Sequence, residues 1–488
     1  MSAGLQAARA ALAGQRAWLV GGFLRDRLLG RESPELDLDV VVEGDPAAAA
    51  RAVARAAGGA AFFALSEQFG AWRVVARDHS WQVDVQSLRG GSLAADLALR
   101  DFTVNAIAEP IEGGAPIDPL GGLADAQDRR LRVAGPSAFA DDPLRVLRLA
   151  RMAVELDLQP EGATLELARR HAGELTACAG ERLFAELRRL LASAQPLRGM
   201  ELMSDLGATA AVLPEVHALR DVQQSRFHHT DVYRHTLEVL AQTVALTAAI
   251  SGQPGAAEAP SWAASMRALS EDDRAGAAAL LAEPLADGMS RGEALRWGAL
   301  LHDIAKPPTR RVQSPEGRVT FLGHDRLGAE VARGVLERMR VSERLRAHVA
   351  ALTRHHLRLG FLVHEPQPLS RRTVYAYLRA CEPVQADVTL LSVADRLATR
   401  GERAQEAIEA HVRLAWSLLG EALRWHEHGP PPPLLRGDEL ARELQMAPGP
   451  ALGELVEALA QEQFAGEVRT RGDAIAFARR WQRPGTSE

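Results

Sequence analysis

Hydrophobic and polar positions form short, partly alternating runs near the N-terminus and follow helical spacing through the rest of the 488-residue chain. Short apolar runs of this kind, bounded by glycine or polar residues, are typical of strands. They predict strands in RAWLVGG (16–22), LDLDVVV (36–42), GAWRVVA (70–76) and WQVDVQ (81–86). Between the second and third run, DPAAAARAVARAAGG (45–59) predicts a helix that stops at its two glycines.

Strand patterns almost vanish after Ser137. Apolar residues then recur at helical spacing, with arginines on the other faces, in DDPLRVLRLARMAVEL, GATLELARRHAGEL and GERLFAELRRLLASA. A further helical region begins near Leu213 and holds most of the histidines, and HGPPPPLLRGDEL is a stiff proline-rich linker into a last helical segment. The pattern therefore predicts a multidomain α+β protein. We expect a mixed-sheet head (1–135), an all-helical neck (136–212), a helical third domain (213–428) with an insertion at 251–290, and a helical tail (429–488).

Composition narrows the class of protein without identifying it. Hydrophobic residues make up 47% and charged residues 25% of the chain, and the net charge is −6, so nucleic-acid binding would depend on local basic faces. The chain has two cysteines, which is too few for a disulfide framework and favours a reducing cytoplasm. We find no signal-peptide pattern and no apolar run of about 18 residues, so we expect no membrane partner. The sequence does not indicate an oligomeric state.

The run LDLDVVV carries two aspartates on one side of a predicted strand. Asp37 and Asp39 share a face with Cα atoms about 6.6 Å apart, whereas Leu36, Leu38 and Val40 point to the other face. Neighbouring carboxylates repel, and a divalent cation removes that cost; Mg²⁺ prefers carboxylates together with substrate phosphates. Two such ions can activate an attacking hydroxyl and neutralise a leaving pyrophosphate. A solvated strand edge remains the alternative for an isolated Asp-x-Asp.

Two flanking motifs strengthen the metal interpretation. Gly21 and Gly22 end a strand and open a predicted helix that carries Arg25 and Asp26, and glycines at a helix start allow a phosphate to approach the backbone. Downstream, WQVDVQ places Asp84 on another strand as a possible third catalytic carboxylate.

Four motifs in order give the chain a family resemblance. LVGGFLRD…LDLD, LRDFTVNAIA, IDPLGGLADAQDRRLR and ADDPLRVLRLARMAVEL resemble the bacterial class II tRNA nucleotidyltransferase and poly(A) polymerase family, the CCA-adding type. The resemblance runs from about Arg16 to the end of the chain. It implies a nucleotidyltransferase head that joins CTP and ATP to the 3′ end of tRNA or another RNA.

The resemblance also implies roles for individual residues of the head. Asp37 and Asp39 would hold Mg²⁺, and Gly22 and Arg25 would contact the incoming triphosphate. It further implies nucleotide contacts in the segment LRDFTVNA, where the family usually has a second arginine at the position of Leu99: Arg100, Asp101 and Asn105.

The predicted neck helix offers a way to read bases. Asp142 and Arg145 would be i,i+3 neighbours, one accepting and one donating hydrogen bonds. Cytosine and adenine both present an amino donor beside a ring-nitrogen acceptor, so one Asp–Arg pair suits both and rejects guanine and uracil. Arg148 and Arg151 continue this face and match nucleotide-binding arginines of the family. A surface ion-pair helix is the alternative.

Two further segments bear on the RNA. GERLFAELRRLLAS would present arginines to RNA phosphates, or would simply be a solvated face: Arg182, Arg188 and Arg189. Between Asp84 and LRDFT the chain has only VQSLRGGSLAADLA, whereas full CCA-adding relatives usually carry a longer flexible loop. This shortening resembles the CC-adding subgroup.

Histidines of the third domain follow the H…HD…D order of HD-family phosphohydrolases. This order comprises His235, His302–Asp303 and Asp395, with further imidazoles at His324, His355 and His356. Mixed nitrogen and oxygen ligands suit a divalent transition metal or Mg²⁺, and Lys306 would contact substrate phosphate. Such a site would hydrolyse phosphate esters with a metal-activated water, although a purely structural HD scaffold is the alternative.

Three other functions remain open at this stage. Poly(A) polymerase shares the head motifs. An HD-type phosphodiesterase or phosphatase could use the head only to bind nucleotide. A non-catalytic RNA-binding protein would not need acidic pairs in both domains, which disfavours that class.

Overall fold

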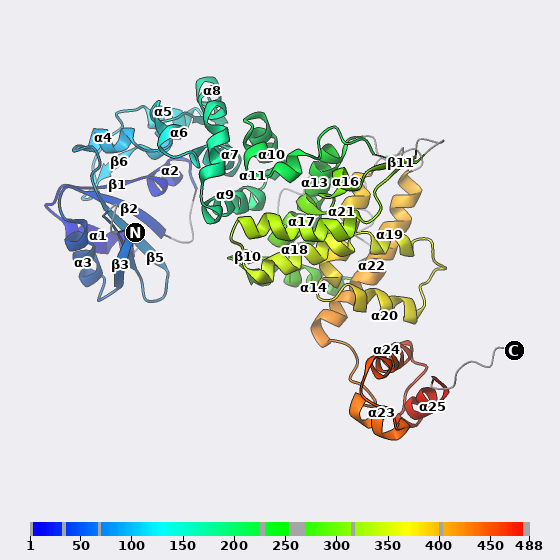
Figure 1. Ribbon diagram of the computed structural model, residues 1–488. Coiled ribbons are helices and arrows are strands. Elements are labelled where there is room, and N and C mark those ends of the chain that lie inside the picture. Colours follow the sequence, from blue (N-terminus) through cyan, green and yellow to red (C-terminus); the bar gives the residue numbers. More distant parts are fainter. Residues whose placement is uncertain are drawn as a thin grey trace. The chain divides into compact units, whose positions relative to one another are not determined.

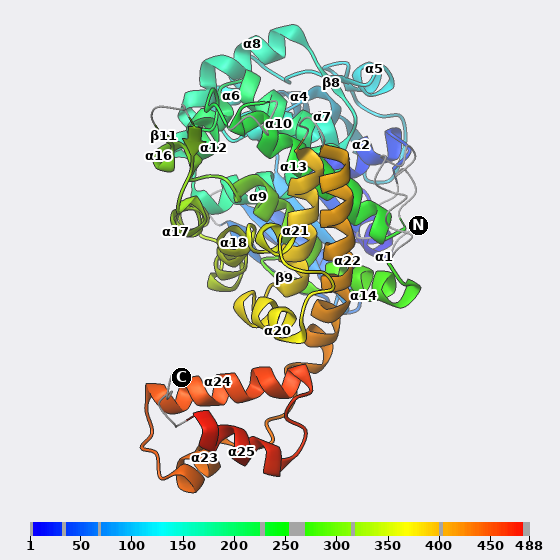
Figure 2. The same ribbon diagram turned by 90° about the vertical axis from the view of Figure 1, so that its right-hand side faces the viewer.

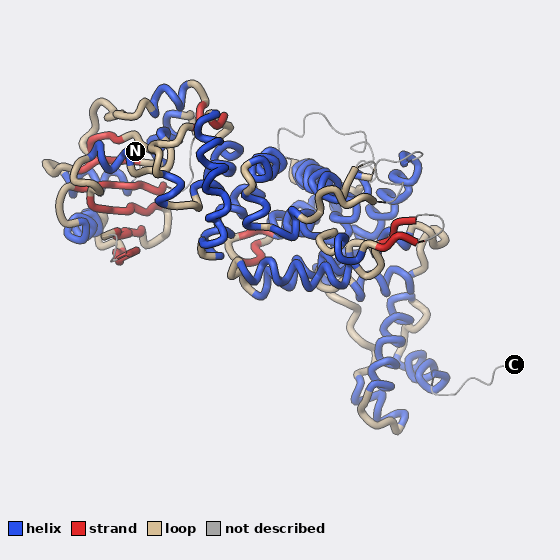
Figure 3. The backbone as a smooth tube through the Cα atoms, turned by 45° about the horizontal axis from the view of Figure 1, so that its top comes forward, coloured by secondary structure: helices blue, strands red, loops and turns tan. Residues whose placement is uncertain are grey.

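A computed structural model describes residues 3–31, 36–66, 70–224, 230–252, 269–313, 318–399 and 404–481. The chain divides into two compact units, Met1–Val212 and Leu213–Glu488, which are described separately. Strands gather in the first unit, and the second is almost wholly helical (Figure 3). This matches the expected α+β class. No helix among the described residues is long and apolar enough to cross a membrane.

The first unit contains a six-stranded sheet in the order β3-β4-β5-β2-β1-β6 (Figure 1). Its strands are β1 (Ala17–Val20), β2 (Leu36–Val42), β3 (Ala61–Ser66), β4 (Ala71–Val75), β5 (Trp81–Ser87) and β6 (Ala108–Pro110). β2 and β5 are parallel, and the other neighbouring pairs are antiparallel. All four predicted strands are confirmed. β3 and β6 were not predicted, because AFFALS lacks a clear alternation and AEP is short and contains proline.

One face of the sheet is buried under α1 (Ala3–Leu12) and α3 (Pro46–Ala56). The side chains of Leu38, Val40 and Val42 enter this core from alternate positions of β2. The predicted helix α3 begins where expected, since the Asp45 side chain accepts a hydrogen bond from the Ala47 amide at 2.8 Å and proline follows it. Burial of this face commits the intervening residues of β2 to the opposite one.

The remaining elements of the first unit are mainly helices. They are α2 (Gly22–Leu28), α4 (Leu93–Ala98), η1 (Thr103–Asn105), α5 (Gly122–Gln127), β7 (Arg130–Leu131), α6 (Ala138–Asp141), α7 (Arg145–Glu155), β8 (Gln159–Pro160), α8 (Gly162–His171), η2 (Ala172–Ala177), α9 (Gly180–Ala192), α10 (Pro196–Asp205) and α11 (Ala208–Val212). The predicted helix over DDPLRVLRLARMAVEL is interrupted. Asp142 is extended and α7 starts only at Arg145, because Pro143 disfavours helical geometry in the residue before it.

Helices form the body of the second unit, with two small hairpins. They are α12 (Pro214–His217), α13 (Val232–Ile250), α14 (Glu271–Ala282), β9 (Pro284–Ala286), β10 (Met289–Ser290), α15 (Arg291–Leu301), α16 (Lys306–Thr309), β11 (Arg311–Gln313), β12 (Arg318–Thr320), α17 (His324–Arg338), α18 (Glu343–His355), α19 (Arg358–Leu362), α20 (Arg371–Ala380), α21 (Gln385–Ala398) and α22 (Ala404–His428). The second half of the expected insertion at 251–290 is folded: it contains α14, which buries Ala277, Leu280 and Leu281. Residues 253–268 lie outside the described residues.

The tail folds into three helices with their own small core (Figure 2). These are α23 (Gly437–Leu444), α24 (Pro450–Ala465) and α25 (Arg471–Trp481). α24 contacts α20 through the bidentate pair of Arg372 with Glu462, at 2.6 and 2.7 Å, and through the Tyr375 hydroxyl, which donates to Glu457 at 3.0 Å.

Candidate active site and candidate metal centre

The acidic pair lies on the face of β2 opposite the α1–α3 core, where Val41 packs in a second cluster and the part that carries the pair opens into a cavity. Asp37 is exposed and Asp39 is half-buried, and both line one cavity, so the predicted shared face is confirmed. Burial raises the pKa of Asp39 to about 6, and the charge of Asp37 adds to the rise. Partial desolvation of its carboxyl group also raises the pKa of Asp37. Two carboxylates whose ionised forms are disfavoured in this way are a suitable oxygen donor set for a divalent cation.

Gly21 closes one side of the acidic pair. β1 runs antiparallel to β2 with Val20 opposite Asp39, which places Gly21 beside that carboxylate. A Cβ atom at position 21 would lie 2.7 Å from Asp39 Oδ2, and the residue has φ +76°. Only glycine therefore fits without displacing the carboxylate.

The acidic pair opens into a cavity of about 970 Å³ whose lining includes every residue predicted to bind nucleotide and both aspartates predicted to hold Mg²⁺. These are Gly21, Gly22, Arg25, Asp26, Asp37, Asp39, Arg100, Asp101, Asn105, Asp142, Arg145, Arg148 and Arg151. The sequence interpretation missed five other lining residues: Phe23, Arg27, Arg31, Gln86 and Arg89. With Arg189, the described residues of the lining include nine arginines and five aspartates. The excess of cations suits a polyanionic ligand such as a triphosphate.

A hydrogen-bonded series orders one wall of the cavity. Arg25 Nη1 donates to Asn105 Oδ1 at 2.7 Å, and Asn105 Nδ2 donates to Asp101 Oδ1 at 2.9 Å. The other oxygen of Asp101 lies 3.0 Å from Arg148. Burial acts to raise the pKa of Asp101, but Arg148 and Asn105 outweigh it and lower that pKa. The carboxylate thus stays ionised and fixes Arg148 from one side and Asn105 from the other.

Asp84 lies level with Asp39 on the parallel neighbour β5, as the sequence interpretation required for a third carboxylate. Its two oxygens, however, accept from the Arg73 guanidinium on β4, both at 2.7 Å. Asp84 does not line the cavity. The geometry favours a role in the sheet, and its catalytic role stays a prediction.

The predicted Asp142–Arg145 helical pair is wrong in its geometry, because the two residues do not share a helix. Asp142 Oδ2 instead accepts from Arg182 at 2.7 Å. The Arg145 guanidinium donates to backbone carbonyls, that of Leu99 at 2.9 Å and that of Ala138 at 3.1 Å. Both side chains still reach the cavity, from the chain before α7 and from its first residue.

Arg151 belongs to a network between α7 and α9. Its guanidinium is buried, with Nε 2.5 Å from Glu186 and a second contact to Glu155. Arg189 donates to the same Glu155 at 2.6 Å, and Arg188 is half-buried on α9. These contacts hold α7 against α9, so carboxylates of the protein already occupy much of the donor capacity of Arg151 and Arg189.

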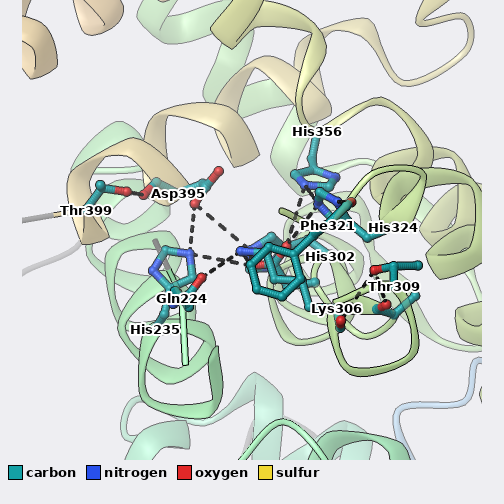
Figure 4. A network of polar contacts seen from close by, with 12 residues as sticks. Gln224, His235, His302, Lys306, Thr309, Phe321, His324, His356, Asp395 and Thr399 are labelled. Atoms are coloured by element: carbon teal, nitrogen blue, oxygen red, sulfur yellow. Dashed lines mark hydrogen bonds and ion pairs between the residues drawn. The ribbon is translucent and has the colours of Figure 1, made fainter. Parts of the chain in front are cut away.

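The second candidate site brings four of the predicted histidines, His235, His302, His324 and His356, together near Asp395 (Figure 4). His302 Nε2 lies 3.1 Å from Asp303 Oδ2, and His324 Nε2 lies 3.3 Å from Asp303 Oδ1. His235 Nε2 lies 3.0 Å from Asp395. Within the described residues, two groups have ligand atoms close enough for one ion each: His235, His302 and Asp303, and Asp303, His324 and His356. Asp303 belongs to both groups.

Backbone carbonyls set the orientation of three of these rings. Nδ1 of His302 lies 2.9 Å from the Ala299 carbonyl, and Nδ1 of His324 and of His356 each lie 2.7 Å from a carbonyl three residues earlier. A carbonyl only accepts, so each Nδ1 carries a proton and each Nε2 is the ring atom directed to the centre. This arrangement is typical of metal-binding histidines.

The electrostatics of the centre fit a bound cation. Among the described residues, the buried Nε2 atom of His302 forms no hydrogen bond of good geometry, and Asp303 Oδ2 lies 3.1 Å from it. Burial lowers the pKa of His356 to about 4, which favours the neutral ring that a metal requires. Burial acts to raise the pKa of Asp395, but its hydrogen bond with His235 outweighs this and holds that pKa far below its usual range. The residues present therefore fit a divalent metal with nitrogen and oxygen ligands.

His355 was predicted as a ligand, and the structure contradicts this. Its Nδ1 accepts from Arg358 at 2.9 Å, and it belongs to neither candidate ligand group. His355 is the last residue of α18, whereas His356 follows the helix and turns inward. Sequence adjacency gave both histidines the same weight, but one helical step of about 100° separates their directions.

A pocket of about 600 Å³ opens beside this centre and includes Asp303, Lys306 and Asp395. Lys306 Nζ lies 2.7 Å from Asp303 and donates to Gln224 at 2.8 Å. Among the lining residues that were not predicted for the site, four carry a basic side chain or an imidazole: Arg318, His364, Arg396 and His411. Of these, His364 is exposed, and its isolated position in the sequence gave no signal for the site. His228 and His229 lie outside the described residues.

Comparisons with known proteins match the order of these sites. Residues 17–132 match the poly A polymerase head domain, 157–220 the probable RNA and SrmB-binding site of polymerase A, and 274–400 the HD domain. In solved structures, the Thermotoga maritima CCA-adding enzyme complexed with tRNA has a TM-score of 0.60 at 19% identity, covering 98% of this chain and 94% of that one. At 19% sequence identity, this structural similarity shows the shared fold and no more.

Two relatives match along nearly their whole length. The A-adding tRNA nucleotidyltransferase of Deinococcus radiodurans is 36% identical over 470 residues, 95% of each chain. The CC-adding tRNA nucleotidyltransferase of Thermus thermophilus is 32% identical, covering 96% of this chain and 94% of its own. Since likeness of this extent includes the head, the helical neck and the HD domain, the chain belongs to the tRNA nucleotidyltransferase family.

Proposed function

We propose that the protein transfers nucleotides to the 3′ end of tRNA without a nucleic-acid template, adding either the whole CCA end from CTP and ATP or, as the short segment after β5 favours, CMP units alone. The observation that carries this proposal is the pair Asp37 and Asp39 at a cavity lined by nine arginines. Poly(A) polymerase activity remains the alternative. The two relatives matched over nearly their whole length are tRNA enzymes, which favours the tRNA reaction.

In this reaction the head positions a triphosphate against an RNA hydroxyl. Asp37 and Asp39 would hold Mg²⁺, which when bound favours deprotonation of the 3′-hydroxyl and offsets charge on the pyrophosphate. Arg25 and Arg148, fixed through Asn105 and Asp101, would bind the phosphates. A bond forms between the RNA 3′-oxygen and the α-phosphorus, the bond to pyrophosphate breaks in line, and pyrophosphate leaves.

Base selection would use the part of the cavity that contains Asp142 and Arg145. Arg145 is held by the carbonyls of Leu99 and Ala138, which limits its movement. Asp142 would have to exchange its contact with Arg182 for the amino group of the base. A ring-nitrogen acceptor beside an amino donor is common to cytosine and adenine, so one site would serve both nucleotides.

We further propose that addition stops after the second cytidine. The segment between β5 and α4 is short, a feature that resembles CC-adding enzymes. The relatives do not decide the matter, because one is A-adding and the other CC-adding.

The test is to incubate purified protein with tRNA transcripts that lack CCA or that end in CC, with CTP and ATP singly and together, and to sequence the 3′ ends. Products that end in CC support the proposal, and a terminal A on either substrate rejects it. Long adenosine tracts on a non-tRNA transcript would favour poly(A) polymerase.

A second activity, metal-dependent phosphohydrolysis, is favoured by the convergence of Nε2 atoms on Asp303. When bound, a divalent metal would supply an activated water. His302, His324 and His356 would hold a transition metal or Mg²⁺, and Lys306 would orient the phosphate. The test is hydrolysis of a 2′,3′-cyclic nucleotide by metal-depleted protein that has been reloaded with Mn²⁺, Ni²⁺ or Mg²⁺ in turn. Absence of hydrolysis with every metal would leave a structural HD domain.

A further inference from the structure

Two arginines of the nucleotide cavity share one buried carboxylate. Arg89 and Arg100 both line the cavity, whereas Asp96 lies behind them on α4 and is 1% exposed. Asp96 Oδ1 accepts from Arg89 Nε at 2.8 Å, and Asp96 Oδ2 accepts from Arg100 Nη2 at 3.1 Å. Each oxygen therefore fixes a different guanidinium.

The charge balance leaves both arginines able to bind an anion. One carboxylate faces two guanidiniums, and each keeps further N–H donors. Burial acts to raise the pKa of Asp96, but the hydrogen bond from Arg89 and the charge of Arg100 outweigh it and lower that pKa. The carboxylate thus remains ionised, and removal of its charge would leave two adjacent cations without a partner.

Arg100 reaches the reacting end of the cavity. A Cβ atom built on Gly21 would lie 3.4 Å from Arg100 Nη1 and 2.7 Å from Asp39 Oδ2, so the guanidinium and the acidic pair flank the same glycine. The positive charge of Arg100 acts to lower the pKa of Asp39, opposing the effect of burial. A phosphate beside the acidic pair would be within its range.

The short segment after β5 fixes Arg89 in place. Gly90 and Gly91 have φ +68° and +77°, so the chain turns sharply just after Arg89. Ser92 then caps α4 by accepting from the Ala95 amide at 3.2 Å. A Cβ on Gly90 would lie 2.8 Å from the Ala95 Cβ, so the turn packs directly on the helix that carries Asp96. The segment is therefore a well-packed turn, and its first residue, Arg89, lines the cavity.

We propose that Arg89 contacts the triphosphate of the incoming nucleotide and that Asp96 is the positioning residue that holds Arg89 and Arg100 toward it. This inference rests on the proposed nucleotidyl transfer. It gives the short segment between β5 and α4 a role in nucleotide binding. The phosphates that Arg89 contacts would be those of the nucleoside triphosphate and not those of the RNA backbone.

The test compares Arg89→Ala and Asp96→Asn with the wild-type protein. CTP and ATP binding is measured by calorimetry without RNA, and the KM values for nucleotide and for tRNA are measured separately. Loss of a charged hydrogen-bonding contact predicts a roughly tenfold weaker nucleotide Kd and a similar rise in nucleotide KM for each variant, with the KM for tRNA unchanged. Arg77→Ala, an exposed arginine of the same unit outside the cavity, is the matched control.

Two further variants separate positioning from folding. Arg89→Lys keeps a charge and should recover part of the affinity, which a purely structural defect would not show. Asp96→Asn in the Arg89→Ala background should weaken nucleotide binding by less than the product of the single effects. If Asp96→Asn does not fold, Arg89→Ala alone decides, because its half-exposed side chain is removable without a core defect.

The outcomes distinguish this inference from the proposed function. Unchanged nucleotide Kd and KM in Arg89→Ala would overturn the inference while the wild-type protein still binds and incorporates nucleotide. A rise confined to the KM for tRNA would overturn the assignment to the triphosphate. If the wild-type protein binds neither CTP nor ATP, the proposed function itself fails and the inference falls with it.

Discussion

The two sites of this protein use acidic residues in opposite ways. In the head, Asp37 and Asp39 stand at an open cavity whose lining is dominated by arginines, and burial raises the pKa of both carboxyls. In the HD domain, Asp303 is buried among imidazoles, and the neighbouring His302 and Lys306 outweigh burial and hold its pKa well below the usual range.

The two sites differ in how far their side chains are oriented before a ligand binds. In the head site, the carboxylates of Asp37 and Asp39 repel each other until a cation and a polyanion bind together. The HD centre is organised in advance, since carbonyls fix the Nδ1 protons of His302, His324 and His356. We therefore expect the head to bind metal weakly without nucleotide and the HD centre to retain metal during purification.

The largest expected effect comes from removing the acidic pair. Asp37→Ala combined with Asp39→Ala should lower nucleotide incorporation by at least about a thousandfold and spare phosphohydrolase activity, because each site has its own set of ligand residues. Incorporation of labelled CTP into tRNA measures the first activity and cyclic-nucleotide hydrolysis the second. Asp128→Ala, an exposed aspartate outside the cavity, is the control. Loss of both activities in the double variant would contradict two independent sites.

The reverse loss is expected in the HD domain. His302→Ala combined with Asp303→Ala should abolish hydrolysis and retain nucleotide addition. His356→Ala should lower the metal content of the purified protein roughly tenfold or more, whereas His355→Ala should leave it unchanged. Elemental analysis of the bound metal checks both single variants. If His355→Ala and His356→Ala lowered the metal content equally, the assignment of His356 and not His355 as a ligand would be wrong.

A smaller effect is expected from Gly21→Ala. The new Cβ would meet Asp39 Oδ2 at 2.7 Å, and the left-handed backbone adds about 1–2 kcal/mol of strain. We expect a tenfold to hundredfold lower incorporation rate. Gly14→Ala carries the same backbone strain at φ +72° with no atom within 4 Å, and should change only the melting temperature. Similar rates in the two variants would mean that Asp39 can move freely.

The smallest effects are expected from replacing the two side-chain amides that orient a cation, Asn105 in the head and Gln224 in the HD domain. We expect the two effects to differ in size. Asn105→Ala removes the link from Arg25 to Asp101 and should raise the nucleotide KM roughly tenfold. Steady-state kinetics at saturating tRNA measure this change.

Gln224→Ala should slow cyclic-nucleotide hydrolysis by no more than about fivefold, because Asp303 still holds Lys306 at 2.7 Å. An effect of Gln224→Ala larger than that of Asn105→Ala would reverse the view that the HD centre is the more rigid of the two.

Much of this architecture was predictable from local patterns. Alternation along LDLDVVV determined which face of β2 carries Asp37 and Asp39, because a buried face forces its neighbours to the other side. Ordered motifs indicated the family, and the H…HD…D order located most of the second centre. These features depend on periodicity or on residues close together in the chain, which is why sequence alone was sufficient.

Tertiary structure decided the contacts between distant segments. Pro143 separated Asp142 from α7, and Arg182, from α9, became its partner. Arg73 took both oxygens of Asp84 across the sheet. No sequence period encodes which guanidinium meets which carboxylate, because many pairings are nearly equal in energy at the surface and packing of the backbone selects among them. The sequence thus determined the types of chemistry present, and the fold determined which groups are free to perform them.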